Sequence, residues 1–437
     1  MYLSEELQKK WEKVLNHPEL PQIKDPLKKA VLSVLLENQV EDMTRKGTIG
    51  LNMLNENREQ QLNEGAPANA AQGFPNDNPN LMGYDPVLIS LLRRALPNLM
   101  AFDVLGVQPL KASSGMIFAL KSKYTAQDGD EALHFEADTA FSGEGAHSDP
   151  LDPFAPPTAG TGMPTSDAEK LGRPGEDEFA EMAFSIDKIT VEARSRALRA
   201  EYTMEVAQDL KAVHGLDAEN ELANILSAEI LAEINREVIR KIYISAVLGA
   251  QQDTAVAGQF NLDFDSNGRW SVEKYKGLMV QIERDANAVA KETRRGRANF
   301  LICDSDTASC LSVAGLLDCN SALKDNLNVD DTGNTFVGVL NGRFKVYIDP
   351  YAPLTQNYFV AGYKGPNQYD AGMFYCPYVP LQMLRAVEYK SFGPAIGFKT
   401  RYGIVANPFS NLLGNSTGAI VANTNVYYRK VKVLNLL

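Results

Sequence analysis

A long amphipathic pattern near the middle of the chain constrains the fold more than any other feature. From Ala218 to Leu248, apolar residues recur at helical spacing. Asp217 can cap the start of this helix and Gly249 can end it. At about 1.5 Å per residue the rod would be roughly 45 Å long. Because no comparable helix is indicated beside it, we interpret it as a structural spine. The apolar stripe consists of Leu222, Ile225, Leu226, Ile230, Leu231, Ile234, Val238 and Ile242.

Shorter helices and strands follow this pattern in mixed order. A helix is expected over 272–292, a strand over 300–303 and a second helix over 305–317. A strand-rich stretch from Gly338 to Phe409 comes next, and further strands run to Leu437. A strand, a helix and a strand followed by antiparallel strands indicate a mixed α+β fold.

Two extended segments flank a region rich in chain-breaking residues. Residues 141–176 hold 6 Gly and 6 Pro, which predicts an irregular exposed loop. Alternating sequences over 116–124 and 183–202 predict a long strand on each side of it. An isolated two-stranded arm is marginally stable in water. We therefore expect the arm to lie on another surface, such as a neighbouring subunit.

The first 64 residues differ in composition from the rest of the chain. They carry 9 Lys/Arg and 11 Asp/Glu, with apolar residues at helical spacing around 7–15 and 27–35. Helices of this size cannot build a core alone and need a partner surface. From Gly65 to Asn80 the sequence becomes a Gly/Ala/Pro/Asn-rich linker.

The boundary between these two regions has the features of a processing site. Leu62-Asn63-Glu64 comes directly before Gly65 and the linker. A protease needs extended, exposed chain, which a linker supplies. The Leu-x-Glu triplet is weak by itself, because it recurs elsewhere, for example at Leu54-Asn55-Glu56.

Composition argues against several other classes of protein. A net charge of −12 and a pI near 5 disfavour a dedicated nucleic-acid binder; we interpret Arg294-Arg295-Gly296-Arg297 as a solvated helix end. No apolar run is long enough to span a membrane and the N-terminus is not a secretory signal, so we expect the chain to be made in a cytoplasm. The cysteines show no metal-ligand or disulfide spacing and are expected as small buried hydrophobes. They are Cys303, Cys310, Cys319 and Cys376.

No residue pattern supports catalysis, a cofactor or a metal. Asp304 and Asp306 follow a predicted strand, but they also precede a helix, where Asp acts as a cap. Glu205 and Asp209 share one helix face, most simply a solvated one. No serine lies in a Gly-x-Ser-x-Gly elbow. We therefore expect no enzyme activity, although composition alone leaves an unrecognised α+β enzyme open.

The stretch from Gly338 to Phe409 contains nine of the 17 tyrosines, many glycine turns, one Cys and no His. This composition predicts a packing surface and not a site of chemistry. Together with three other runs, this stretch resembles one family. The runs are LLRRALPNLMAFD (91–103) continuing to Gly106-Val107-Gln108-Pro109, EVAQDLKAVHG (205–215) and EINREV (233–238). The resemblance is collinear over most of 80–410 and points to the major capsid proteins of T4-like tailed bacteriophages.

This resemblance implies an HK97-like capsid fold, divided as follows. Residues 1–64 would be a helical, scaffold-like prosegment that is cleaved off; 65–112 the N-terminal arm; 113–202 the E-loop with its tip at 141–176; 203–275 the peripheral domain with the spine helix 218–248; 276–390 the axial domain; and 391–437 strands returning to the peripheral domain. The T4 protein has an inserted domain in the E-loop region, whereas only the Gly/Pro-rich tip stands at that place here.

The family also implies a function and a set of partners. Hexamers would build the icosahedral or prolate head shell, pentamers of a vertex protein would complete it, and DNA would be enclosed without specific binding. An internal scaffold protein, decoration proteins and a prohead protease are implied partners, and Leu62, Glu64 and Gly65 match the cleavage pattern of that protease. The shell would be assembled in the host bacterial cytoplasm and become part of the virion. Two readings with the same fold stay open: the pentameric vertex protein itself and an encapsulin-like shell protein.

Overall fold

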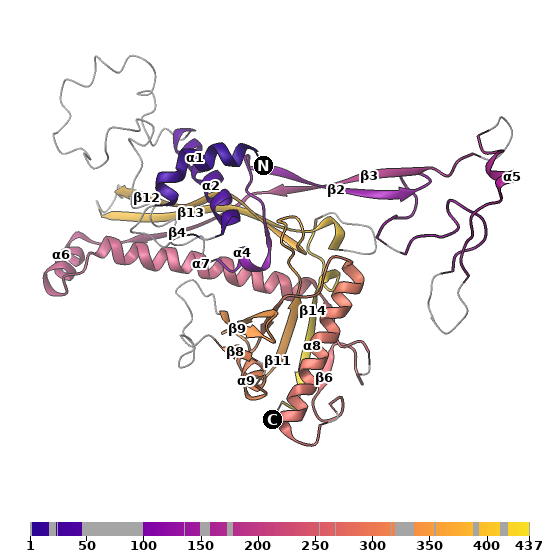
Figure 1. The fold of residues 1–437 in the computed structure, drawn as a ribbon. Coiled ribbons are helices and arrows are strands. Elements are labelled where there is room, and N and C mark those ends of the chain that lie inside the picture. The colour runs from indigo at the N-terminus through magenta and orange to yellow at the C-terminus, as the bar shows by residue number, and fades with distance from the viewer. Residues whose placement is uncertain are drawn as a thin grey trace, which may run out of the picture. The chain divides into compact units, whose positions relative to one another are not determined.

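The computed structural model divides into two compact units (Figure 1). The larger comprises Met1–Gly115 and Val191–Leu437, and the smaller Met116–Thr190. The structure describes residues 2–16, 23, 25–45, 99–134, 136–148, 158–172, 178–252, 254–266, 268–315, 317–319, 336–353, 355–387, 393–410 and 418–436.

One sheet of the larger unit has four strands in the order β1-β12-β13-β4. The strands are β1 (Gly106–Val107), β12 (Met373–Val387), β13 (Pro394–Ala406) and β4 (Arg194–Glu201). β1 runs parallel to β12, and the other pairs are antiparallel. The long helix α7 (Ala218–Ser245) packs against β4 and β13.

Two N-terminal helices cover this sheet on the side opposite α7 (Figure 1). They are α1 (Tyr2–Leu15) and α2 (Pro26–Arg45); they pack on each other, and α2 packs on β12. Their buried side chains share one hydrophobic core with α7 and the sheet. The prediction that these helices need a partner surface is therefore confirmed, and the surface belongs to the same chain.

The second sheet of the larger unit has eight strands. Seven follow the order β5-β14-β11-β7-β10-β9-β8, and β6 also pairs with β14. Helices α8 (Ser271–Thr293) and α9 (Ser305–Val313) pack on it and close a separate core. The strands are β5 (Ala246–Leu248), β6 (Gln259–Asn261), β7 (Phe300–Cys303), β8 (Leu317–Cys319), β9 (Phe336–Leu340), β10 (Phe344–Ile348), β11 (Asn357–Gly362) and β14 (Asn425–Leu434).

The smaller unit is built on the two-stranded sheet of β2 (Ser114–Tyr124) and β3 (Met182–Glu192). Its loop contains the short helix α5 (Thr165–Ala168) and an isolated bridge between Glu144 and Thr161. The described part of 141–176 is otherwise irregular, as the glycines and prolines predicted.

The predicted spine helix is confirmed, and only its end differs. Asp217 caps α7 by accepting a hydrogen bond from the Glu219 backbone N–H at 3.2 Å. The helix ends at Ser245 and not at Gly249, because the chain turns there into β5, which pairs with β14. The Gly249 backbone N–H donates to the Lys430 carbonyl at 2.8 Å and so belongs to that sheet edge.

Some predicted strands are divided differently in the structure. The segment 183–202 breaks at Ala193: β3 pairs with β2, whereas β4 pairs with β13 in the four-stranded sheet. The arm is therefore shorter than predicted. β12 lies in the four-stranded sheet, and β14 lies beside β11 in the eight-stranded sheet.

Two isoleucines of α7 allow a matched test of this packing. Ile242 is 0% exposed in the main core, whereas Ile225, which belongs to the same predicted stripe, is 61% exposed. We expect Ile242→Ala to lower the free energy of unfolding by about 2–5 kcal/mol through lost burial and a cavity. Ile225→Ala should change it by less than about 0.5 kcal/mol. Urea unfolding of the unassembled chain measures both, and equal effects would contradict this placement of α7.

Candidate assembly surfaces

The arm exposes large apolar side chains along both of its strands. They alternate with better-buried neighbours and are each between 55% and 65% exposed. They are Met116, Phe118 and Leu120 on β2 and Met182, Phe184 and Ile186 on β3. In an ordinary half-buried strand the outward-facing residues are polar, whereas here they are apolar.

The intervening residues show that these apolar side chains share one face. Lys121 forms a 2.9 Å ion pair with Asp187 across the two strands. Ile117 and Ile189, which alternate with the exposed residues, are buried. Since neighbouring residues of a strand point to opposite faces, the six exposed side chains all lie on the other face. An exposed apolar patch of this kind is typical of a protein interface.

A partly buried charged cluster joins α7 to the four-stranded sheet. Glu237 accepts hydrogen bonds from Arg196 of β4 and Tyr402 of β13, both at 2.5 Å, and pairs with Lys241 at 2.6 Å. Arg196 also pairs with Glu233 at 2.7 Å. Burial by itself raises the pKa of Glu237, but the bonds from Lys241, Tyr402 and Arg196 lower this pKa to about 2. The carboxylate is therefore ionised wherever the protein is folded near neutral pH.

The neighbouring residue on α7 makes a similar connection to the eight-stranded sheet. Arg236 forms a 2.6 Å ion pair with Asp349, which directly follows β10 and is 1% exposed. The hydroxyls of Tyr243 and Tyr358 donate to the same carboxylate at 2.9 and 2.8 Å. Burial raises the pKa of Asp349, but Arg236 and Tyr358 outweigh it, and the pKa lies below its usual value. Buried charge is tolerated here because it is fully hydrogen-bonded.

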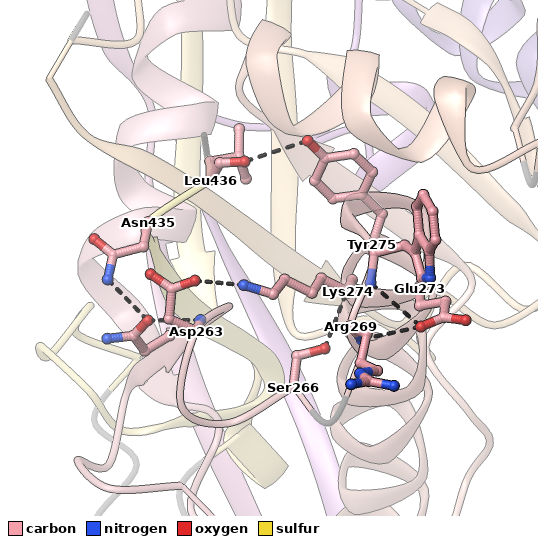
Figure 2. A network of polar contacts seen from close by, with 10 residues as sticks. Asp263, Ser266, Arg269, Glu273, Lys274, Tyr275, Asn435 and Leu436 are labelled. Atoms are coloured by element: carbon pink, nitrogen blue, oxygen red, sulfur yellow. Dashed lines mark hydrogen bonds and ion pairs between the residues drawn. The ribbon is translucent and has the colours of Figure 1, made fainter.

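A third polar network holds the loop before α8 and the C-terminal end of the chain together (Figure 2). Glu273 accepts from the backbone N–H groups of Arg269 and Trp270, at 3.0 and 3.3 Å. Lys274 pairs with Asp263 at 2.5 Å. Tyr275 donates to the Leu436 carbonyl at 3.4 Å. The Trp270 ring stays largely exposed on this fixed loop, so the network shapes a surface and does not enclose a site.

The carboxylates considered for chemistry have structural or solvated positions. Asp304 is the N-cap of α9 and accepts from the Ser305 backbone N–H at 2.7 Å, and Asp306 lies in the first turn. Glu205 and Asp209 lie exposed on α6 (Met204–Val213). Within the described ranges, no three His, Cys, Asp or Glu side chains are grouped so that they could hold a metal ion.

The remaining sequence expectations have mixed outcomes. Cys303, Cys310 and Cys376 are buried and unbridged, as small hydrophobes. Arg294 is the C-cap of α8, and this basic cluster lies at an exposed helix end, as predicted. Among the described helices, none combines the length and the apolar character that a membrane span needs. The cleavage residues Leu62, Glu64 and Gly65 lie outside the described residues.

The interpretation of the tyrosine-rich stretch as an outer packing surface is wrong for most of its rings. Five of the tyrosines are buried inside the larger unit, whereas only Tyr351 and Tyr369 of the described ones are strongly exposed. The buried five are Tyr347, Tyr363, Tyr375, Tyr378 and Tyr402. Composition could not separate internal from external packing, because both use aromatic rings with a polar tip.

Comparison with known proteins identifies the family of the chain, which its geometry alone does not. The family model described as Major capsid protein Gp23 matches residues 81–433. The chain belongs to the Gp23 major capsid protein family. It is 36% identical to the "Major capsid protein" of Vibrio phage KVP40, covering 98% of this chain and 100% of that protein. With the "Major capsid protein" of Enterobacteria phage T4 it shares 34% identity over 98% of each chain.

The alignment with the T4 protein runs over 516 positions, more than the 437 residues of this chain. The T4 protein therefore has segments without a counterpart in this chain. Among solved structures, the capsid of Myoviridae Phage XM1 matches with a TM-score of 0.41 and 9% identity, covering 77% of this chain and 92% of that one. The Gp23-family chain is a structural component of a T4-like phage head shell and thus of the virion, and its elements confirm the α+β class.

The cluster around Glu237 predicts a specific dependence of stability on pH. The pKa of Glu237 is about 2 in the folded chain against an ordinary value of 4.5, so its contribution to stability is fully present above pH 4.5 and is lost as the pH falls toward 2. We expect Glu237→Gln to lower the urea midpoint at pH 6 and to make that midpoint fall less between pH 4.5 and 3 than in the wild type. Glu205→Gln, at an exposed position, is the control; identical pH profiles for E237Q and wild type would exclude this role.

Proposed function

We propose that this chain forms the hexamers of the phage head shell, with the arm of each copy lying on a neighbouring copy. The proposal rests on one observation: the face of six apolar side chains on β2 and β3. A two-stranded sheet that exposes such a face is only marginally stable in water. Covering that face with protein removes its apolar side chains from water and so stabilises the sheet. A head-shell protein has many identical neighbours that can provide the cover.

A contact between the arm of one copy and the larger unit of the next copy would suit a closed ring. The arm is a separate compact unit, whereas the buried tyrosines and both large cores belong to the other unit. The apolar arm of one copy would therefore contact a different surface on the next copy. Such heterologous contacts close into rings when the rotation between copies allows it. Six copies in a ring give the hexamer.

We also propose that the shell matures by a cut between Glu64 and Gly65. Support comes from the Leu62-x-Glu64 pattern at the start of a small-residue linker, and from the family to which the chain belongs. The segment 1–64 carries 9 Lys/Arg against 11 Asp/Glu, so its removal changes the charge of the chain by only two units. Its role is therefore one of contact and not of charge neutralisation.

The proposed partners follow from these two steps. They are a prohead protease for the cut, an internal scaffold protein, pentamers of a vertex protein and decoration proteins on the finished shell. Assembly would take place in the host bacterial cytoplasm. The acidic mature chain suits a wall that encloses DNA without binding it specifically.

A vertex role is the second candidate, since a "Capsid vertex protein" of Enterobacteria phage T4 is also similar. That similarity is 26% identity over 54% of this chain, against 34% over 98% for the T4 major capsid protein. The longer and closer match favours the hexamer-forming protein.

Two leucines of the smaller unit test the arm contact. Leu120 lies on the apolar face of β2, and Leu133 lies in the loop and is 84% exposed. We expect Leu120→Asp to reduce the yield of shells, measured by sedimentation and negative-stain microscopy, at least tenfold, because it would place a charge in a buried contact. Leu133→Asp should assemble as the wild type does. Normal shells from L120D would contradict the proposal.

The cut is tested by the N-terminus of the mature particle. Mass spectrometry of mature heads should find chains that begin at Gly65, and Glu64→Ala should leave the segment attached. Glu56→Ala changes the same type of triplet at another position and should be processed normally. Mature heads made of chains with an intact Met1 would refute the cut.

A further inference from the structure

The N-terminal helices are built into the core of the protein. Leu32, Leu35 and Leu36 of α2, with Trp11 and Leu15 of α1, are at most 4% exposed. They belong to the same continuous core as the four-stranded sheet and α7. A segment that merely carried a signal for a scaffold would have no reason to bury its apolar face in its own chain.

One side chain of α2 completes the hydrogen bonding of the sheet. The buried Asn38 amide donates to the Leu110 carbonyl at 2.7 Å and to the Tyr378 carbonyl at 3.0 Å. Tyr378 lies where the register of β12 against β13 shifts, between Pro377 and Val379. At this irregularity in the strand pairing, Asn38 supplies the Tyr378 carbonyl with a hydrogen-bond donor. A buried carbonyl without a hydrogen bond lowers the stability of the fold, so the Asn38 amide stabilises α2 at this position on the sheet.

The start of α2 is held by charge as well. Lys28 pairs with Asp103 at 3.3 Å, and its ammonium lies 5.9 Å from the centroid of the Phe102 ring. Asp103 and Phe102 belong to the short helix α4 (Ala101–Val104) that precedes β1. The contact of α2 therefore combines an apolar face, a side-chain amide that donates to two backbone carbonyls and an ion pair, as a protein interface does.

We propose that the sheet face opposite α7 is a binding site for α1 and α2 of the same chain, and that a cut after Glu64 leaves these helices bound. The inference rests on the proposed cut. A cut in the linker breaks a covalent tether but none of the contacts of Leu35, Asn38 or Lys28. Exposure of the sheet face then requires a second event, a change in the sheet or further digestion of the helices, after the cut.

If the proposal is correct, cutting the chain after residue 64 does not by itself release α1 and α2. A cut made by an engineered protease site can test this. In the full chain, residues 62–65 are replaced by the recognition sequence of a site-specific protease unrelated to the phage. The unassembled protein is cut and passed over a size-exclusion column, and each peak is analysed for the N-terminal fragment. We expect the fragment to elute with the remainder of the chain, and still to do so in 1 M salt, since most of the contact is apolar.

Variants of α2 show whether retention uses the observed contacts. Asn38→Ala should dissociate at least tenfold faster after the cut, and Leu35→Asp should lose the fragment completely. Leu27→Asp, the same substitution at an exposed position of α2, should retain it. Near-UV circular dichroism before cutting checks that each variant has folded. If L35D has not folded, the comparison of fragment retention between the wild type and N38A tests the proposal.

The outcomes are distinct for the two proposals. A wild-type fragment that separates on the column overturns the binding site, and so does equal retention in wild type, N38A and a folded L35D. Mature heads with an intact Met1 would refute the natural cut but leave the column result unchanged, because the engineered protease does not depend on Glu64.

Discussion

The structure depends on the attachment of one helix to two sheets. The apolar side of α7 fills the main core, and two adjacent residues on its polar side reach in different directions. Glu237 binds Arg196 and Tyr402 of the four-stranded sheet, whereas Arg236 binds Asp349 at the end of β10 in the eight-stranded sheet. Ion pairs of this kind contribute little to stability when they are exposed to solvent. Partly buried pairs with several hydrogen bonds fix the relative positions of the elements that they join. A shell subunit needs this rigidity, since small errors in its shape add up around a closed shell.

The chain carries two apolar surfaces with different occupants. The sheet face opposite α7 is covered by α1 and α2, so the newly made chain is closed on that side. The face of the arm that carries Phe118 and Phe184 is uncovered in the isolated chain. We interpret the first as a contact made within one copy and the second as a contact made between copies. A protein that must stay soluble before assembly benefits from keeping one of its apolar surfaces covered.

Helices and strands with a clear periodic pattern could be predicted from the sequence, whereas contacts between residues far apart in the chain could not. The stripe of α7 and its cap Asp217 were predictable, because both depend on residues close together in the chain. The clusters of Glu237 and Asp349 were not, since Tyr402 and Asp349 lie more than a hundred residues from α7. The local signal was limited to adjacent opposite charges, Arg236 and Glu237, among the several charged residues on the polar side of this amphipathic helix. The end of α7 was misplaced for the same reason: β5 is fixed by pairing with the distant β14.

The apolar face of the arm was predictable in part. Alternation over 116–124 and 186–191 indicated strands, and the length of the loop between them indicated an arm in need of support. Which of the two faces is covered within the chain required the structure, because Ile117 and Phe118 are equally apolar in sequence. The extent of the arm was overestimated, since the segment after Ala193 pairs with β13 instead.

A cryo-electron microscopy map of the assembled shell would show whether the arm lies on a neighbouring copy. We expect Phe118, Leu120 and Phe184 of each copy to be buried under residues of another copy, at van der Waals distance. A well-ordered arm whose apolar face is open to solvent in the shell would contradict it.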